Sequence, residues 1–158
     1  MKLYQKATVI HERSLGPSHP HAITSVLGCA TALAQLGDVA SLKALHQRFV
    51  KSLIAKVGVS SSQYFKLVQG FAVSMRTAGN NREALLLQKE SCATAAKVFG
   101  TLSLEAASSY SSMGTLLNAM SDKVSARRYL EKSLKIRMRE LGPDHEMTQL
   151  VQQRIAEL

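Results

Sequence analysis

The sequence predicts an all-α protein in which repeated pairs of antiparallel helices stack into an α-solenoid. Three observations support this prediction. Glycines recur at one constant interval, at Gly16, Gly58, Gly100 and Gly142. Residues that favour the start of a helix recur at the same interval. Between these positions, apolar residues lie three and four places apart, which puts them on one face of a helix. A helix pair of this length cannot cover its own apolar face, so neighbouring pairs must stack.

Two columns of short polar residues mark the expected helix starts. Asp38, Asn80 and Asp122 form the first column, and their side-chain oxygens can accept from the free backbone N–H groups that open a helix. The second column is interrupted at Leu102, whose neighbours Thr101 and Ser103 can serve instead. Its other members are Ser18, Ser60 and Asp144.

Each repeat is expected to hold a first-type helix, a tight turn and a second-type helix. The apolar stripes of the first-type helices begin at Ile23, Phe65 and Ala107. The chain is expected to open with a second-type helix and to close with a first-type helix, so that eight helices result. The second-type helices and the two terminal helices are predicted at residues 39–56, 81–98, 123–140, 2–15 and 145–157.

The whole chain, residues 1–158, is therefore interpreted as one array. It starts and stops within a repeat, which suggests a piece of a longer array. Its predicted parts are residues 1–16, the second helix of a truncated repeat; three full repeats at residues 17–58, 59–100 and 101–142; and residues 143–158, the first helix of a truncated or capping repeat.

Composition indicates an ordinary globular chain, with 46% hydrophobic and 20% charged residues. No apolar run is long enough to span a bilayer, and the N-terminal residues lack the apolar core of a signal peptide. We therefore expect a cytoplasmic location, with association with the cytoskeleton as an option. Cys29 and Cys92 lack the spacing of a metal knuckle or a disulfide framework and are expected to be reduced and packed.

No catalytic, metal or cofactor motif stands out. The sequence holds no phosphate-binding loop, nucleophile elbow or metalloprotease helix. His19 and His21 are separated by one residue, but His19 belongs to a repeat linker and no cysteine or carboxylate joins it. We therefore expect a protein that is not an enzyme and that has no cofactor and no metal site.

The linkers LGPSHPHA at 15–22 and LGPDHEMT at 141–148 follow helices of the type YQKATVIHERS and YLEKSLKIRMRE. Together with the 42-residue interval of the glycines, they resemble the kinesin light chain type of tetratricopeptide repeat (TPR), over essentially the whole chain. Small residues at the helix crossings match that family at Ala30, Ala72 and Gly114. The resemblance implies a right-handed superhelix, with first-type helices lining a concave groove that holds a peptide or protein partner.

That likeness implies an adaptor or scaffold whose groove is lined by the face opposite each apolar stripe. The side chains there are small or able to hydrogen-bond, so we expect an extended peptide with at least one acidic residue. The alternative is that these are ordinary solvated positions. The expected groove residues are Thr24, Leu27, Thr31, Lys66, Gln69, Val73, Arg76, Ser108, Ser111, Ser112, Thr115 and Asn118.

A second candidate surface is basic. The net charge of +9 favours acidic partners. The last second-type helix holds a basic ridge, which is either a solvated face or a site for acidic protein, cytoskeletal, lipid or nucleic-acid surfaces. Aromatics are too few to favour nucleic acid. Self-association through exposed terminal helices stays open. The ridge comprises Lys123, Arg127, Arg128, Lys132, Lys135, Arg137 and Arg139.

Overall fold

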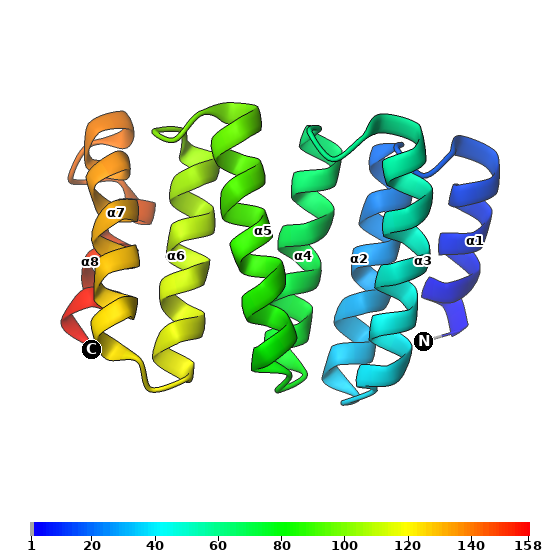
Figure 1. The fold of residues 1–158 in the computed structure, drawn as a ribbon, viewed down its shortest axis with the longest axis horizontal. Helices are drawn as coiled ribbons and strands as arrows, with labels where there is room; N and C mark the ends of the chain where they lie inside the picture. The colour runs from blue at the N-terminus through cyan, green and yellow to red at the C-terminus, as the bar shows by residue number, and fades with distance from the viewer. Residues whose placement is uncertain (1) are drawn as a thin grey trace. The chain divides into compact units, whose positions relative to one another are not determined.

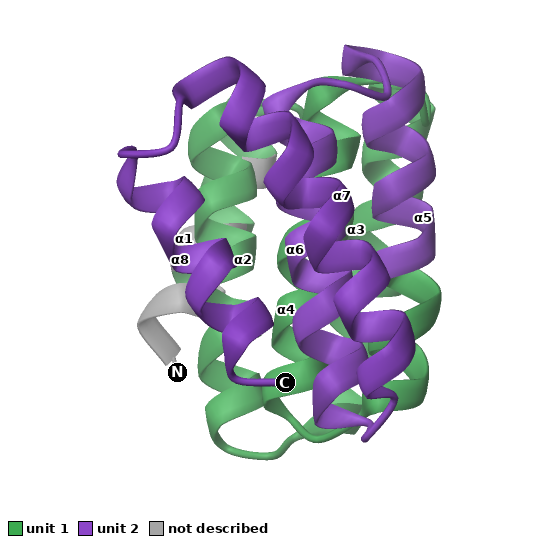
Figure 2. Ribbon diagram, turned by 90° about the vertical axis from the view of Figure 1, so that its left-hand side faces the viewer, with its two compact units in different colours: residues 1–87 green, residues 88–158 purple. Residues whose placement is uncertain are grey.

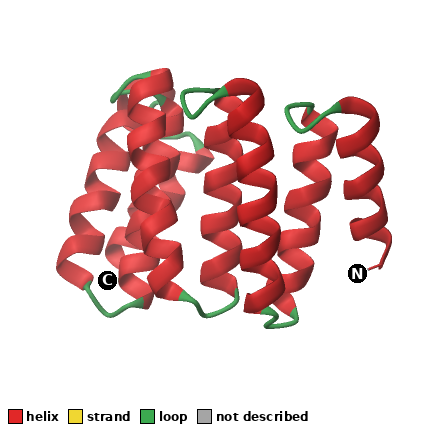
Figure 3. Cartoon of the chain, turned by 45° about the vertical axis from the view of Figure 1, so that its right-hand side comes forward, coloured by secondary structure: helices red, strands yellow, loops and turns green. Residues whose placement is uncertain are grey.

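A computed structural model describes the backbone of residues 2–158 and the side chains of residues 6, 9–11 and 13–158. Over this range the chain forms eight α-helices joined by short loops, and no strand (Figures 1 and 3). The helices are α1 (Lys2–Leu15), α2 (Pro20–Gln35), α3 (Val39–Val57), α4 (Ser62–Thr77), α5 (Asn81–Phe99), α6 (Leu104–Ala119), α7 (Lys123–Leu141) and α8 (Glu146–Ala156).

The helices repeat with the period of the glycines. The first-type helices α2, α4 and α6 each have 16 residues, and the second-type helices α3, α5 and α7 each have 19. Within each set, successive helices begin at the interval that separates Gly16 from Gly58. The all-α prediction and the order of the helices are confirmed within the described residues, and each helix end that was predicted lies within one residue of the observed one.

The turn within each repeat has one backbone geometry in all three copies. After α2, the Gly37 N–H donates to the Ala34 carbonyl at 3.1 Å and the Asp38 N–H donates to the Leu33 carbonyl at 3.0 Å. These two bonds form a Schellman motif, which needs a left-handed residue where Gly37 has a φ of 69°. The turns after α4 and α6 make the equivalent bonds.

Residue 121 departs from this pattern. Gly79 takes the left-handed position in the second turn with a φ of 77°, whereas Ser121 takes it in the third with a φ of 65°. A side chain at a positive φ is unfavourable because its Cβ crowds the following carbonyl. The third turn is therefore strained relative to the other two.

The first predicted column of N-caps is confirmed. The second is confirmed at Ser103, which was expected to serve in place of Leu102, and its other members are wrong by one residue. Asp38 and Asp122 cap α3 and α7, and the Asn80 Oδ1 accepts from the Glu83 N–H at 3.3 Å. Ser18, Ser60 and Asp144 are not the caps, because the linker runs one residue further from its left-handed glycine before the helix begins. The observed caps are the next residues along the chain, His19, Ser61, Ser103 and His145, which are evenly spaced like the glycines.

The two capping histidines use a ring nitrogen where the serines use a hydroxyl. The His19 Nδ1 accepts from the His21 N–H at 3.2 Å, and the His145 Nδ1 accepts from the Met147 N–H at 3.1 Å. An accepting Nδ1 carries no proton, so each cap needs the neutral ring. These bonds explain the linker histidines as structural residues.

The chain divides into two compact units, residues 1–87 and 88–158 (Figure 2). In unit 1, α2 packs against α1, α3 and α4, and Phe49 and Phe71 lie fully buried. In unit 2, α7 packs against α6 and α8 around residues that include Met113 and Leu130. The boundary lies within α5, so the division of the chain into three repeats stays a prediction.

The crossing of α6 and α7 depends on a small residue, as predicted for Gly114. A Cβ added to Gly114 would lie 2.6 Å from the Leu130 Cγ and 3.0 Å from the Ala126 carbonyl oxygen. The buried Ser133 hydroxyl also donates across this crossing, to the Ala107 carbonyl at 2.7 Å. Small residues therefore let the two backbones approach closely.

The cysteines are free thiols. Cys29 is buried and Cys92 is half-buried. Both cysteines are therefore packed residues, as expected, and burial raises the pKa of the Cys92 thiol to about 11. Within the described residues, no helix combines the length and the apolar character that crossing a membrane requires.

Candidate binding surfaces

The predicted groove residues of unit 1 lie on α2 and α4. Thr24 and Thr31 are exposed, and each hydroxyl donates to a carbonyl one turn earlier in its own helix, at 3.0 Å in both cases. Leu27 is half-buried because it packs against Gly70, where an added Cβ would lie 2.8 Å from the Leu27 Cδ1. The α2 part of this surface is therefore mostly occupied with its own helix and its neighbour.

On α4, polar and apolar side chains share the exposed face. Lys66 is exposed, Val73 is 39% exposed, and Gln69 and Arg76 are half-buried. Neither Lys66 nor Arg76 forms an ion pair with a carboxylate among the described side chains. Two cations that have no carboxylate partner among the described side chains, beside an exposed valine, can contact a ligand that carries both charge and apolar groups.

The predicted groove residues of unit 2 lie on α6, and three of them line a pocket. Ser108, Ser111 and Ser112 border an open pocket of about 120 Å³. The other predicted α6 residues lie outside it: Thr115 is half-buried and Asn118 is exposed. The pocket is completed by residues of α7 and α8, namely Arg137, Met147, Leu150, Val151 and Arg154.

Sequence reasoning missed the contribution of α8. Arg154 follows Ser112 by one repeat interval, the same interval that separates Gly100 from Gly142, and Leu150 follows Ser108 in the same way. Extending the groove register by one more repeat would have found both residues.

A guanidinium of α8 reaches the serine-rich face of α6. The Arg154 Nη1 donates to the Ser111 Oγ at 3.2 Å and to the Thr115 Oγ1 at 3.3 Å. Figure 2 shows α6, α7 and α8 together within unit 2. The pocket thus gains a positive charge that none of the predicted α6 residues carries.

Arg137 does not belong to the exposed basic ridge where its sequence run placed it. The side chain is only 5% exposed, and its Nε donates to the buried Ser133 Oγ at 3.2 Å. Burial, together with the charge of Arg154, lowers the pKa of Arg137. Its position on α7 explains the difference, because it lies one turn after Ser133 on the face that packs against α6.

The six other ridge residues are exposed, as expected, but three of them have intramolecular partners. The Lys123 Nζ donates to the terminal Leu158 oxygen at 2.6 Å. Arg139 pairs with Glu140 and also donates to the Leu102 carbonyl at 3.1 Å. The cations at both ends of the ridge therefore already take part in intramolecular hydrogen bonds or ion pairs.

The middle of the ridge includes a lysine that lies over aromatic rings. The Lys132 Nζ is 5.3 Å from the centroid of the Tyr129 ring and 5.9 Å from that of Tyr110, both within cation–π range. The ridge is thus a real basic surface, but not a uniform one.

The histidines near the N-terminus form a ring cluster without the ligand set of a metal site. His19 and His21 are stacked with centroids 5.3 Å apart, and His21 lies 6.3 Å from His11. The His11 Nδ1 is hydrogen-bonded to the Ser25 Oγ at 2.6 Å. Among the described side chains, no cluster of His, Cys, Asp and Glu could hold a metal ion.

Comparison with known proteins agrees with this architecture. Residues 106–146 match the family model for the tetratricopeptide repeat. Among solved structures, the chain is similar to BtubC (BKLC) from P. vanneervenii, with a TM-score of 0.79 and 11% sequence identity. That match covers 99% of this chain and 61% of the other chain. A comparison with curated proteins found no match.

The family model covers α7, most of α6 and the linker that follows. The structural match shows the same fold over nearly the whole chain. Both agree with the regular recurrence of helices and turns along the sequence. Residues 106–146 therefore match a tetratricopeptide repeat, and the chain as a whole has the fold of a tetratricopeptide-type solenoid.

Proposed function

We propose that the chain is an adaptor or scaffold that binds a peptide or protein segment along the exposed face of its first-type helices. Tetratricopeptide repeats are in general modules for protein interaction and not catalysts. The observation that carries the proposal is the exposed face of α4, where Lys66 and Arg76 lack carboxylate partners among the described side chains.

The charge on the exposed face of α4 favours a partner with acidic character. Lys66 and Arg76 supply positive charge, and the protein as a whole has a net charge of +9. Val73 lies between them in sequence, so one short segment could place an acidic and an apolar side chain on the same surface. The proposal includes a cytoplasmic location, where such a partner would be met.

Charge reversal on α4 tests the proposal. We expect Lys66→Glu combined with Arg76→Glu to weaken binding of the natural partner at least about tenfold, since like charges would replace attraction in the contact. Partners are first captured with the wild-type chain, and their affinities for each variant are then measured with purified proteins.

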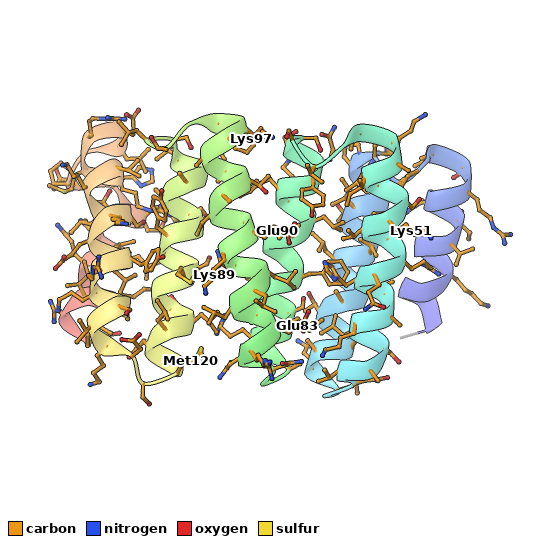
Figure 4. The ribbon with its side chains drawn as sticks, viewed as in Figure 1. Lys51, Glu83, Lys89, Glu90, Lys97 and Met120 are labelled. Carbon is orange, nitrogen blue, oxygen red and sulfur yellow. The ribbon has the colours of Figure 1, made fainter. Side chains whose placement is uncertain are left out.

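A matched control reverses the charge of two exposed lysines on second-type helices. Lys51 lies on α3 and Lys97 on α5 (Figure 4). The double variant Lys51→Glu and Lys97→Glu changes the net charge by the same amount, and we expect it to retain binding. Equal loss in both double variants, or in neither, would remove α4 as the binding surface.

The runner-up is the basic ridge of α7, without Arg137. Arg127, Arg128 and Lys135 are exposed there without a carboxylate partner among the described side chains. A ridge that binds acidic surfaces should lose affinity steeply as salt is added, whereas a peptide-binding face should show a modest salt dependence. Loss of the partner on reversal of Arg127 and Arg128 would favour the ridge.

A further inference from the structure

Arg137 places its guanidinium in the interior of unit 2. The side chain is 5% exposed, and the partner of its Nε, the Ser133 hydroxyl, is neutral. Among the described side chains no carboxylate pairs with Arg137. Burying a charge without an opposite charge is costly, so such a group in a folded protein calls for a specific reason.

A second arginine lines the same pocket. Arg154 extends from α8 and donates to the Ser111 and Thr115 hydroxyls, and it too lacks a carboxylate partner in the part of the chain that the structure describes. Both arginines border the pocket of about 120 Å³ together with Ser108, Ser111 and Ser112. Two cations and three hydroxyl groups therefore line one small opening.

The nearest acidic residues in sequence already have partners. Glu140 pairs with Arg139, and the Glu157 Oε1 accepts from the Gln153 side chain at 2.7 Å. The positive charge of Arg154 also disfavours the charged form of Arg137. The pocket thus has an excess of two positive charges that the described side chains leave uncompensated.

We propose that the pocket lined by Arg137 and Arg154 binds a phosphate monoester, the side chain of a phosphoserine or phosphothreonine in a bound peptide. Arginine forks match phosphate oxygens, and a phosphate carries close to two negative charges with three acceptor oxygens. A carboxylate carries one negative charge and would leave one cation uncompensated. This inference deepens the proposed function and rests on it for the peptide, but not for the anion.

The binding test uses simple probes and the full chain. Inorganic phosphate, N-acetyl-phosphoserine amide and acetate are titrated at matched ionic strength, with backbone amide chemical shifts as the readout. We expect saturable shifts at Ser111, Ser112 and Arg154 with both phosphates, and binding of acetate at least about tenfold weaker. Binding of phosphoserine amide but not inorganic phosphate would identify the peptide ester as the ligand, and the reverse would identify a free phosphate.

A pair of charge-matched variants separates the pocket from general basic attraction. Arg154→Gln removes a pocket cation, and Arg82→Gln removes an exposed cation of α5. We expect Arg154→Gln to weaken phosphate binding by about tenfold or more, since a charged hydrogen-bond donor is lost, and Arg82→Gln to leave it unchanged. Equal affinity in the two variants would overturn the proposal.

Thermal unfolding distinguishes a ligand-binding role of Arg137 from a structural role, because removal of its charge should raise the melting temperature in the first case and lower it in the second. Arg137→Met keeps most of the side-chain volume and removes the uncompensated charge. We expect this variant to melt at a higher temperature than the wild type without phosphate, and to gain no stability when phosphate is added. A lower melting temperature together with undiminished phosphate binding would contradict the proposal.

The two proposals can fail separately. If phosphate fails to bind but charge reversal on α4 still releases the partner, the peptide-binding face stands and the phosphate site falls. If phosphate binds through Arg154 but the α4 variant retains every partner, the anion site stands without the groove.

Discussion

The exposed faces of the first-type helices differ between the two units, although the backbone repeats at the same interval in both. In unit 1, Gly70 lets Leu27 pack closely, and the threonine hydroxyls of α2 bind their own helix. In unit 2, the positions that follow Gly70 in the register are Ser112 and Arg154, and they line an open pocket with the buried Arg137.

The difference between the two units shows that the sequence has two roles in this fold. The glycines and caps set the register, and with it the places where side chains can project. The residues in each column then decide whether those places are filled by internal packing, as at Leu27, or leave a charged group lining an open pocket, as at Arg154. The same scaffold can thus carry different binding chemistry in its two units.

The largest change that we expect is in the reactivity of the cysteine thiols, of which each unit holds one. Cys29 lies in unit 1 and Cys92 in unit 2, and burial raises the pKa of each thiol. The pKa of Cys92 rises from 9.0 to about 11. Near pH 8 the Cys92 thiol of the folded protein should therefore react with iodoacetamide roughly a hundredfold more slowly than the same thiol in the unfolded chain, since only the thiolate attacks.

The same pKa difference gives a pH dependence of stability. The folded state holds the Cys92 proton more tightly than the unfolded state, so the stabilisation is complete below pH 9 and is lost as the pH rises toward 11. The Cys92→Ala variant should lose this part of the pH dependence in urea unfolding. An unchanged profile would show that Cys92 is more solvated than its position indicates.

Alanine at two helical glycines tests the packing of each unit. Gly114→Ala in unit 2 should lower the free energy of unfolding by about 1–3 kcal/mol, because the new methyl meets the Leu130 Cγ and a backbone oxygen. Gly70→Ala in unit 1 meets the ends of the half-buried Leu27 side chain, which can turn aside. Its cost should be largely offset by the better helix propensity of alanine, within about 1 kcal/mol. Urea unfolding of both variants would check this order, and the reverse order would contradict it.

Substitutions at the left-handed positions of the turns should change the free energy of unfolding least. Ser121→Gly should raise the free energy of unfolding by about 0.5–1 kcal/mol, since glycine adopts a positive φ without a Cβ clash. Gly79→Ser, the mirror change in the second turn, should lower it by a similar amount. If both changes prove neutral in urea unfolding, the strain assigned to Ser121 is absent.

Much of the fold could be predicted because it follows from local signals. Left-handed glycines and short polar caps act over a few residues, so helix ends fell within one residue of the prediction. The cap column failed at Ser18 because serine and histidine can both cap a helix, and composition alone does not say which neighbour does so.

The candidate sites were less predictable because they depend on burial. A run of basic residues does not tell which of its members turns inward, and Arg137 does so because Ser133 binds across the helix crossing. The repeat register alone predicts Arg154, because it follows Ser112 by one repeat interval on the last helix. Its contact with Ser111 comes from packing between helices that are well separated in the chain.

Binding of a partner to the exposed face of the first-type helices can be mapped by backbone amide shifts in the labelled full chain when a captured, purified partner is added. We expect the largest changes at Lys66, Val73 and Arg76 on α4, with further changes at Ser111 and Ser112. Changes confined to residues 123–139 of α7 would show that partners bind the basic ridge instead.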